Sequence, residues 1–191
     1  MQARLWLLYI DIQQQSNFSL DKKVFIAYHC GKKWIKVEEH VSSFLGKYYH
    51  TVDPKGRVIM PAPLREVIVT KYSNSRLYIT NAAFDKCLQI YPREEWARLE
   101  EKVRTLPKMD EAVKYFLRRV VAPAVECELD RQGRLLVPYE HRQDAGIQAD
   151  IVIVGQLEKI EIWDRAEWDS VTDPQKIDVR AFASVLAAHG L

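Results

Sequence analysis

The sequence predicts a mixed α/β protein, mainly β, in which two tandem copies of one module share a core. The stretch Asp53-Pro-Lys-Gly-Arg57-Val-Ile-Met-Pro61 returns 77 residues later as Asp130-Arg-Gln-Gly-Arg134-Leu-Leu-Val-Pro138. After each copy come two short β-branched or apolar runs and then a segment that begins with Arg and ends with Trp. A unit of under about 50 residues would cover only about 60% of its unfolded surface, so the two copies must bury a core together.

The first copy predicts four short strands with helices between them. Residues 48–52 are rich in β-formers, and Asp53-Pro-Lys-Gly56 predicts a turn, because Asp bonds its own backbone and Gly accepts a positive φ. Pro61 and Pro92 each suit the first turn of a helix. Glu94 and Glu95 would lie in the first turn of the helix after Pro92, where the positive end of the helix dipole stabilises negative charge. The expected strands are 48–52, 57–60, 77–80 and 87–91, and the expected helices are 62–68 and 92 to about 105.

The second copy repeats this plan. Pro107 breaks the chain, and the apolar stripe in 108–122 predicts a helix that bridges the two modules. Gly146 is suited to the C′ position of a helix over 139–145. The expected strands are 125–129, 134–137, 151–154 and 160–163, and further helices are expected around 164–170 and over 179–189.

Composition excludes several classes of protein. The chain has 191 residues, 48% apolar and 28% charged, and no apolar run approaches the roughly 18 residues of a membrane span. Cys30, Cys87 and Cys127 are isolated, which argues against a disulfide framework and a zinc site. We therefore expect a soluble protein of a reducing cytoplasm, without metal, cofactor or small-molecule substrate, and Cys87 as a buried small hydrophobe.

The charge is unevenly distributed along the chain. Residues 44–122 carry 15 Lys and Arg against 9 Asp and Glu, whereas residues 123–191 carry 7 against 13. One interpretation is uneven surface decoration. The other is that the basic half faces a polyanion while the acidic half meets the basic half of a neighbouring copy.

The repeated Asp-x-x-Gly-Arg motif resembles the tandem SpoVT/AbrB-type repeats of the MraZ family of transcriptional regulators. Arg65 and Arg142 extend the match, and shorter pieces support it: Phe44-x-Gly46, Tyr91-Pro-x-x-Glu95-Trp96, Val154-Gly-Gln and Ile162-Trp163. The resemblance covers roughly residues 44–170. It divides the chain into repeat 1 (47–95), connecting helices (96–122), repeat 2 (124–168) and a C-terminal helical tail (169–191), after an N-terminal extension (1–43).

The resemblance implies a swapped-hairpin β-barrel made by interleaving the two repeats. It also implies a homo-oligomeric ring that binds direct repeats in the promoter of the division and cell-wall gene cluster, including its own gene, in the cytoplasm and with the nucleoid. The functional signature would be Asp53 to Arg57 and Asp130 to Arg134. The resemblance to the family begins near Phe44, so residues 1–43 are additional to it. We expect this extension to be poorly ordered or loosely attached to the rest of the protein. We also hypothesise that the start of the sequence is wrongly assigned and that the true first residue lies near Val41.

A barrel of hairpins would present strands and turns to double-stranded DNA. Arg57 and Arg134 begin the strand after each turn. An arginine at this position can form two hydrogen bonds to the edge of a guanine or to a phosphate. Lys55 and Arg131 lie inside the turns and would contact phosphate, and Lys47 and Arg65 would extend the basic strip. Gly56 and Gly133 would shape the turns. We expect repeat 1 to contact DNA more strongly, because Glu126, Glu128 and Asp130 surround the second turn.

Other interpretations stay open at this point. Asp53 with Arg57, and Asp130 with Arg134, could pair only to hold their turns. An enzyme is disfavoured, because the five histidines are scattered and no catalytic spacing or Gly-rich phosphate loop is present. A single-repeat antitoxin with a disordered tail fits poorly, since this chain has two repeats and a helical tail. An assembly module without DNA contact is harder to exclude.

Overall fold

The computed structural model describes residues 25–29, 32–36, 43–72 and 75–190. The chain divides into two compact units, residues 1–42 and 43–191. In the first unit, β1 (Phe25–His29) and β2 (Lys32–Lys36) form an antiparallel hairpin. Most of the N-terminal extension, with the hypothesised start near Val41, lies outside the described residues, so those expectations stay predictions.

The second unit is mixed α/β and mainly sheet, as predicted. Each repeat supplies four strands: β3 (Lys47–Thr51), β4 (Arg57–Ile59), β5 (Arg76–Asn81) and β6 (Cys87–Pro92) from the first, and β7 (Val125–Glu128), β8 (Arg134–Leu136), β9 (Asp150–Gln156) and β10 (Lys159–Asp164) from the second. Six of them form one antiparallel sheet in the order β3-β9-β10-β6-β5-β7, and β4 pairs with β8 as a two-stranded ribbon.

The strand order interleaves the two repeats. The first strand of repeat 1, β3, pairs with β9 of repeat 2, and the first strand of repeat 2, β7, pairs with β5 of repeat 1. The second strands, β4 and β8, pair with each other across the repeats. Each repeat therefore depends on the other for most of its backbone pairing.

One hydrophobic core shared by both repeats explains why their strands pair with each other. Its buried members come from both repeats and include Val58 and Met60 from the first and Leu135 and Val137 from the second. A smaller cluster lies on the other face of the sheet, where Val152, Val154 and Trp163 pack with Trp168 of α5 (Arg165–Val171). The expected joint core is confirmed. No helix in the described part of the chain is long and apolar enough to span a membrane.

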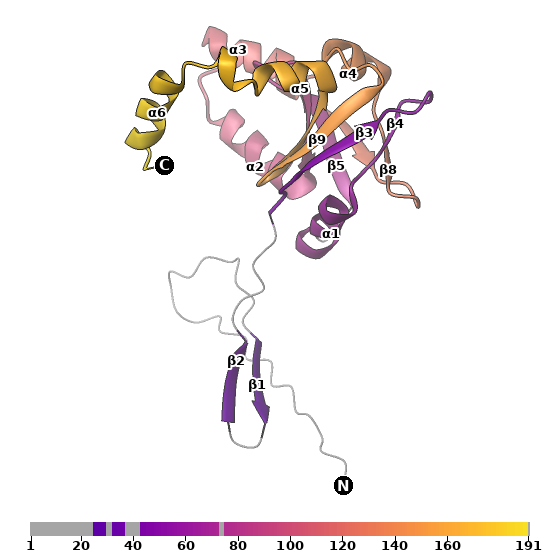
Figure 1. Ribbon diagram of the computed structural model, residues 1–191, viewed down its shortest axis with the longest axis vertical. Helices are drawn as coiled ribbons and strands as arrows, with labels where there is room; N and C mark the ends of the chain where they lie inside the picture. The colour runs from indigo at the N-terminus through magenta and orange to yellow at the C-terminus, as the bar shows by residue number, and fades with distance from the viewer. Residues whose placement is uncertain (1–24, 30–31, 37–42, 73–74, 191) are drawn as a thin grey trace. The chain divides into compact units, whose positions relative to one another are not determined.

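The helices follow the sequence signals with small shifts. They are α1 (Ala62–Lys71), α2 (Arg93–Arg104), α3 (Glu111–Phe116), a π-helix (Leu117–Val121), α4 (Tyr139–Asp144), α5, a 3₁₀ turn (Pro174–Lys176) and α6 (Val179–Ala188). Figure 1 shows α1 below the β4–β8 ribbon and α6 on the opposite side of this unit.

Three helix starts differ in detail from the prediction. Pro61 and Pro92 occupy the N-cap rather than the first turn, with ψ of 139° and 151°, because each still belongs to the extended chain that leaves a strand. The bridging helix begins at Glu111 rather than 108, because the Asp110 side chain accepts a hydrogen bond from the Ala112 amide and caps it there. Glu94 and Glu95 lie in the first turn of α2, as expected.

Candidate nucleic-acid interface

The two repeated turns adopt the same structure. Gly56 has a φ of 81° and Gly133 a φ of 73°, the left-handed conformation that glycine tolerates. The Gly56 amide donates to the Asp53 carbonyl at 2.8 Å, and the Gly133 amide donates to the Asp130 carbonyl at the same distance. The predicted turns are confirmed in both repeats.

Each turn aspartate holds the arginine four residues on. In the first turn, Asp53 Oδ1 accepts from the amides of Lys55 and Arg57 at 2.8 and 2.9 Å. Asp53 Oδ2 accepts from Arg57 Nε at 2.7 Å and lies 2.6 Å from Arg57 Nη2. Both nitrogens of the side edge of the guanidinium, Nε and Nη2, therefore approach the same oxygen, Oδ2, while Oδ1 accepts from the turn amides. Because both groups are ionised, this contact is stronger than a hydrogen bond between neutral groups.

The second turn repeats these contacts. Asp130 Oδ1 accepts from the amides of Gln132 and Arg134, and Asp130 Oδ2 accepts from Arg134 Nε at 2.7 Å and lies 2.6 Å from Nη2. The pairing that the sequence left as an alternative is thus formed by both arginines. It leaves the Nη1 group and one Nη2 hydrogen of each guanidinium uncommitted by the aspartate, because a guanidinium has five N–H donors.

The turn carboxylates are held in the charged form. Hydrogen bonds from the Arg57 amide and side chain lower the pKa of Asp53. Hydrogen bonds from the Arg134 side chain and amide lower the pKa of Asp130 from 3.8 to about 2. Both aspartates therefore stay ionised, and keep their arginines in place, at neutral pH.

The turns meet along the β4–β8 ribbon. In its register Arg57 faces Leu136, Val58 faces Leu135 and Ile59 faces Arg134. The Met60 amide donates to the Gly133 carbonyl, and the Val137 amide donates to the Gly56 carbonyl, both at 2.9 Å. We call residues 53–60 and 130–137 together the basic ribbon.

A further pair of arginines covers the turns. Arg65 on α1 packs against Gly133 of the other repeat, and Arg142 on α4 packs against Gly56. An ideal Cβ at Gly56 would lie 2.9 Å from Arg142 Nη2. Arg142 was missed as a site residue, although its position, 77 residues after Arg65, marks it as the repeat partner.

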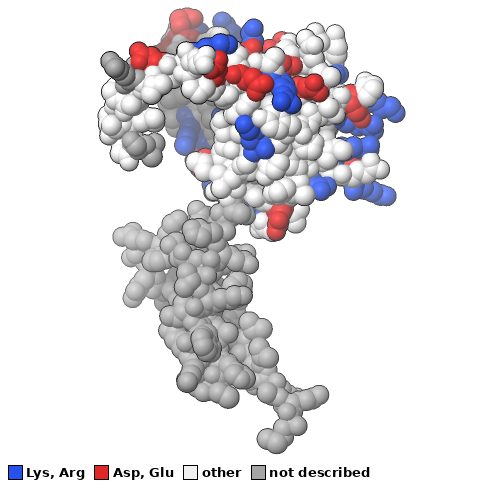
Figure 2. Space-filling model, viewed as in Figure 1, with Lys and Arg blue, Asp and Glu red and all other residues white. Residues whose placement is uncertain are grey.

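The remaining predicted cations lie in different places. Lys55 and Arg131 are exposed at the two turn tips, so the structure brings them onto the basic ribbon. Lys47 lies elsewhere: it is six residues before Asp53, about 20 Å along an extended strand, and its Nζ lies 5.4 Å from the centre of the Tyr49 ring. Figure 2 shows Lys and Arg gathered at the edge of the unit where Figure 1 draws the turns that precede β4 and β8.

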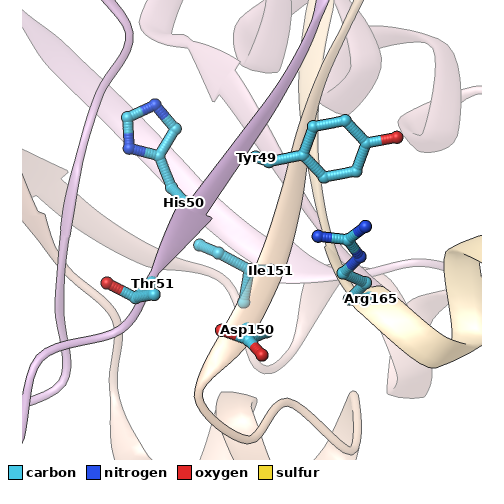
Figure 3. A pocket seen from close by; sticks show the side chains of 6 residues that line it. All are labelled: Tyr49, His50, Thr51, Asp150, Ile151 and Arg165. Carbon is cyan, nitrogen blue, oxygen red and sulfur yellow. The ribbon is translucent and has the colours of Figure 1, made fainter.

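A separate hollow of about 410 Å³ lies beside β3, β9 and α5 (Figure 3). Its lining residues are Tyr49, His50, Thr51, Asp150, Ile151 and Arg165. The Arg165 guanidinium lies 4.5 Å from the centre of the Tyr49 ring and its Nε lies 3.8 Å from Asp169 Oδ2, while His50 projects from the other side of β3. Since its arginine is already engaged by a ring and a carboxylate, we assign this hollow no role in binding a polyanion.

The two glutamates that precede the second turn are surface residues with a structural partner. Glu126 and Glu128 lie on β7 at 3.4 and 3.7 Å from Arg76, and Glu126 also accepts from the Tyr78 hydroxyl. Burial raises the pKa of the Cys87 thiol, as expected for a small core side chain rather than a nucleophile. Among the residues that the structure describes, no three His, Cys, Asp or Glu side chains are grouped to hold a metal ion.

The fold and the basic ribbon define a class: a mainly β protein of two interleaved repeats that presents two aspartate-held arginines on one ribbon. The sequence model of the family described as "MraZ protein, putative antitoxin-like" matches residues 43–119 and 120–184. The chain belongs to the MraZ family.

Curated relatives agree with this assignment. The transcriptional regulator MraZ of Acetivibrio thermocellus is 38% identical over 148 residues, which cover 78% of this chain and 99% of the relative. The protein of the same name from Heliobacterium modesticaldum is 42% identical over 130 residues, 68% of this chain and 87% of the relative. These names describe a regulator and not an enzyme, which confirms the non-enzymatic prediction.

Proposed function

We propose that this protein is a sequence-specific DNA-binding transcriptional regulator. Its targets would be direct repeats in the promoter of the division and cell-wall gene cluster, including its own gene. The names of its relatives support regulation of transcription, and the motif resemblance supports the choice of target. The protein would work in the cytoplasm, associated with the nucleoid.

The observation that carries the DNA-binding proposal is the pair of arginines held by Asp53 and Asp130. Each aspartate engages Nε and one hydrogen of Nη2, so the end edge of the guanidinium, with Nη1 and the second Nη2 hydrogen, is left to form a second pair of hydrogen bonds. Two parallel N–H donors match the O6 and N7 acceptors of guanine in the major groove, or two oxygens of a phosphate. Holding a turn and reading DNA are therefore compatible tasks for Arg57 and Arg134.

The other cations of the ribbon would supply affinity. Lys55 and Arg131 at the turn tips would contact phosphates without reading sequence. Each turn carries two cations, but the first repeat would bind more strongly, because only the second turn follows a strand with two glutamates, Glu126 and Glu128. Lys47 would contribute only a contact to the DNA backbone, at a distance from the ribbon. Arg65 would contribute indirectly, by packing over the second turn.

Assembly would compensate for the small area of one ribbon. We propose that the interleaved strands close as a swapped-hairpin barrel, with repeat boundaries at 47–95 and 124–168, and that the protomers form a homo-oligomeric ring. A few phosphate contacts give only about micromolar or weaker binding. Identical ribbons placed side by side on repeated DNA boxes would gain affinity through effective concentration.

A binding titration at two salt concentrations tests the proposal. The DNA would come from upstream of the gene, and wild type would be compared with Arg57→Ala and Arg134→Ala, with the solution mass measured for each. We expect Arg57→Ala to lose most specific binding while the assembly persists, and Lys55→Ala to lower the salt dependence by about one phosphate contact. Wild-type affinity in both arginine variants would refute recognition by the ribbon.

A second candidate is an assembly module or an antitoxin-like partner protein. The description of the family as antitoxin-like favours considering it. It predicts that wild type binds no promoter DNA specifically, and that Arg57→Ala changes only stability. The same titration therefore separates the two candidates.

A further inference from the structure

The outward face of the basic ribbon carries two apolar side chains between its arginines. Side chains alternate along a strand, so Val58 and Leu135, which are 1% and 0% exposed, point into the core. Ile59 and Leu136 point outward, together with Arg57 and Arg134, and are 53% and 57% exposed. The register places Ile59 opposite Arg134 and Leu136 opposite Arg57.

This pattern departs from that of an ordinary half-buried strand. Such a strand places polar residues on its solvent face, whereas β4 and β8 place isoleucine and leucine there. A single exposed apolar residue needs no explanation. Here the exception occurs at matching positions of both repeats, 59 and 136, and each apolar residue lies directly across from an arginine.

The neighbouring charges indicate what covers this face. Arg57 and Arg134 lie directly across from the two apolar residues, and Lys55 and Arg131 are exposed at the turn tips of the same ribbon. An occupant of this face would therefore combine negative charge with apolar groups. The major groove of DNA has both, since phosphates line it and each thymine presents a C5-methyl group on its floor. Aliphatic contact with that methyl is one of the ways in which proteins identify thymine.

We propose that Ile59 and Leu136 are specificity-determining residues that contact thymine methyl groups beside the guanines bound by Arg57 and Arg134. The inference rests on the proposed DNA-binding function. It adds thymine, beside guanine, as a second base that the ribbon recognises. Two residues along a strand span about 6.6 Å, and bases along one DNA strand are about 3.4 Å apart. The thymines would therefore lie within about two base steps of the guanines.

The test uses the full chain and a duplex selected from a randomised library by binding to the wild-type protein. Each thymine within two steps of a guanine is replaced, one at a time, by deoxyuridine, which removes only the methyl group. Wild type is compared with Ile59→Ala and Leu136→Ala. Leu157→Ala is the matched control, because Leu157 is a similarly exposed leucine, at 55%, in the β9–β10 turn.

We expect deoxyuridine at one or more of these positions to weaken wild-type binding about fourfold, the effect of one buried methyl. Ile59→Ala or Leu136→Ala should bind thymine and uracil duplexes equally, and Leu157→Ala should discriminate as wild type does. Equal binding of every uracil duplex by wild type would overturn the inference. So would a changed solution mass of the alanine variants with unchanged thymine discrimination, since a second copy of the chain would then cover this face.

Failure of the inference can be told apart from failure of the proposed function. If no duplex is enriched in the selection, the DNA-binding proposal itself fails. If a duplex is enriched and Arg57→Ala loses it while Ile59→Ala and Leu136→Ala retain full discrimination, only the thymine contact is wrong. Melting curves of each variant establish that the fold is kept, which is expected because both side chains are more than half exposed.

Discussion

Arg65 of the first repeat covers Gly133 of the second, so closely that a Cβ on this glycine would fall on the guanidinium. Arg142 covers Gly56 in the reciprocal arrangement. A helix of each repeat thus closes the turn of the other. Both glycines are buried although they lie in turns, which shows how tightly the arginines pack on them.

Gly133→Ala should destabilise the fold by about 2 kcal/mol. A left-handed alanine costs about 1–2 kcal/mol, and the added methyl must displace the flexible end of the Arg65 side chain, which adds a smaller cost. Chemical denaturation would measure the change. Gly146→Ala is the matched control, because Gly146 has a φ of 64° but no atom within 4 Å of the added Cβ, so only the conformational cost should appear. Equal losses in both variants would mean that Arg65 yields without cost.

Asp53→Asn should weaken specific DNA binding about tenfold, although it removes a negative charge from a DNA-binding surface. The amide cannot bind the Arg57 side edge as strongly, so the guanidinium loses its fixed orientation. Titrations of specific and random duplexes at one salt concentration would measure this. Tighter binding of both duplexes would show that the aspartate acts only as a repelling charge.

The contribution of Asp130 to stability should be lost only in strong acid. Its folded pKa of about 2 is below the ordinary value of 3.8, so the folded state favours the charged form. The resulting stability is complete above about pH 4 and disappears as the pH falls towards 2. The difference in unfolding free energy between wild type and Asp130→Asn, measured from pH 7 to 2, should stay constant and then shrink over that window. A difference that already falls between pH 7 and 5 would contradict the assigned cause.

Glu161→Ala should destabilise the fold by about 3 kcal/mol. This carboxylate is 3% exposed on the outer face of the sheet and accepts from the side chains of Gln89, Gln156 and Trp163, with Lys159 Nζ at 2.9 Å. Its removal leaves several donors without an acceptor in a buried site. Glu158→Ala, an exposed neighbour, is the control for denaturation. A loss below about 1 kcal/mol would mean that water replaces the carboxylate.

The local features of the fold could be predicted from the sequence because their causes are local. Asp53, Gly56 and Arg57 hold each other within five residues, and the same is true at Asp130, Gly133 and Arg134. The strands and most helices also follow short-range signals. The exact N-caps at Pro61 and Pro92 were not predicted, since they depend on how the chain leaves each strand. The π-helical turn at Leu117–Val121, which continues α3, was not predicted either.

The sequence by itself determined the repeat, the two turns and the charge that they carry. Only the tertiary structure decided that β4 pairs with β8 and that Ile59 lies across from Arg134. It also decided that Arg65 covers Gly133 of the other repeat and that Lys47 lies at a distance from the ribbon. The reason is physical: hydrogen bonds within a turn need only neighbouring residues, whereas strand partners are chosen by the apolar surface that both repeats must bury together.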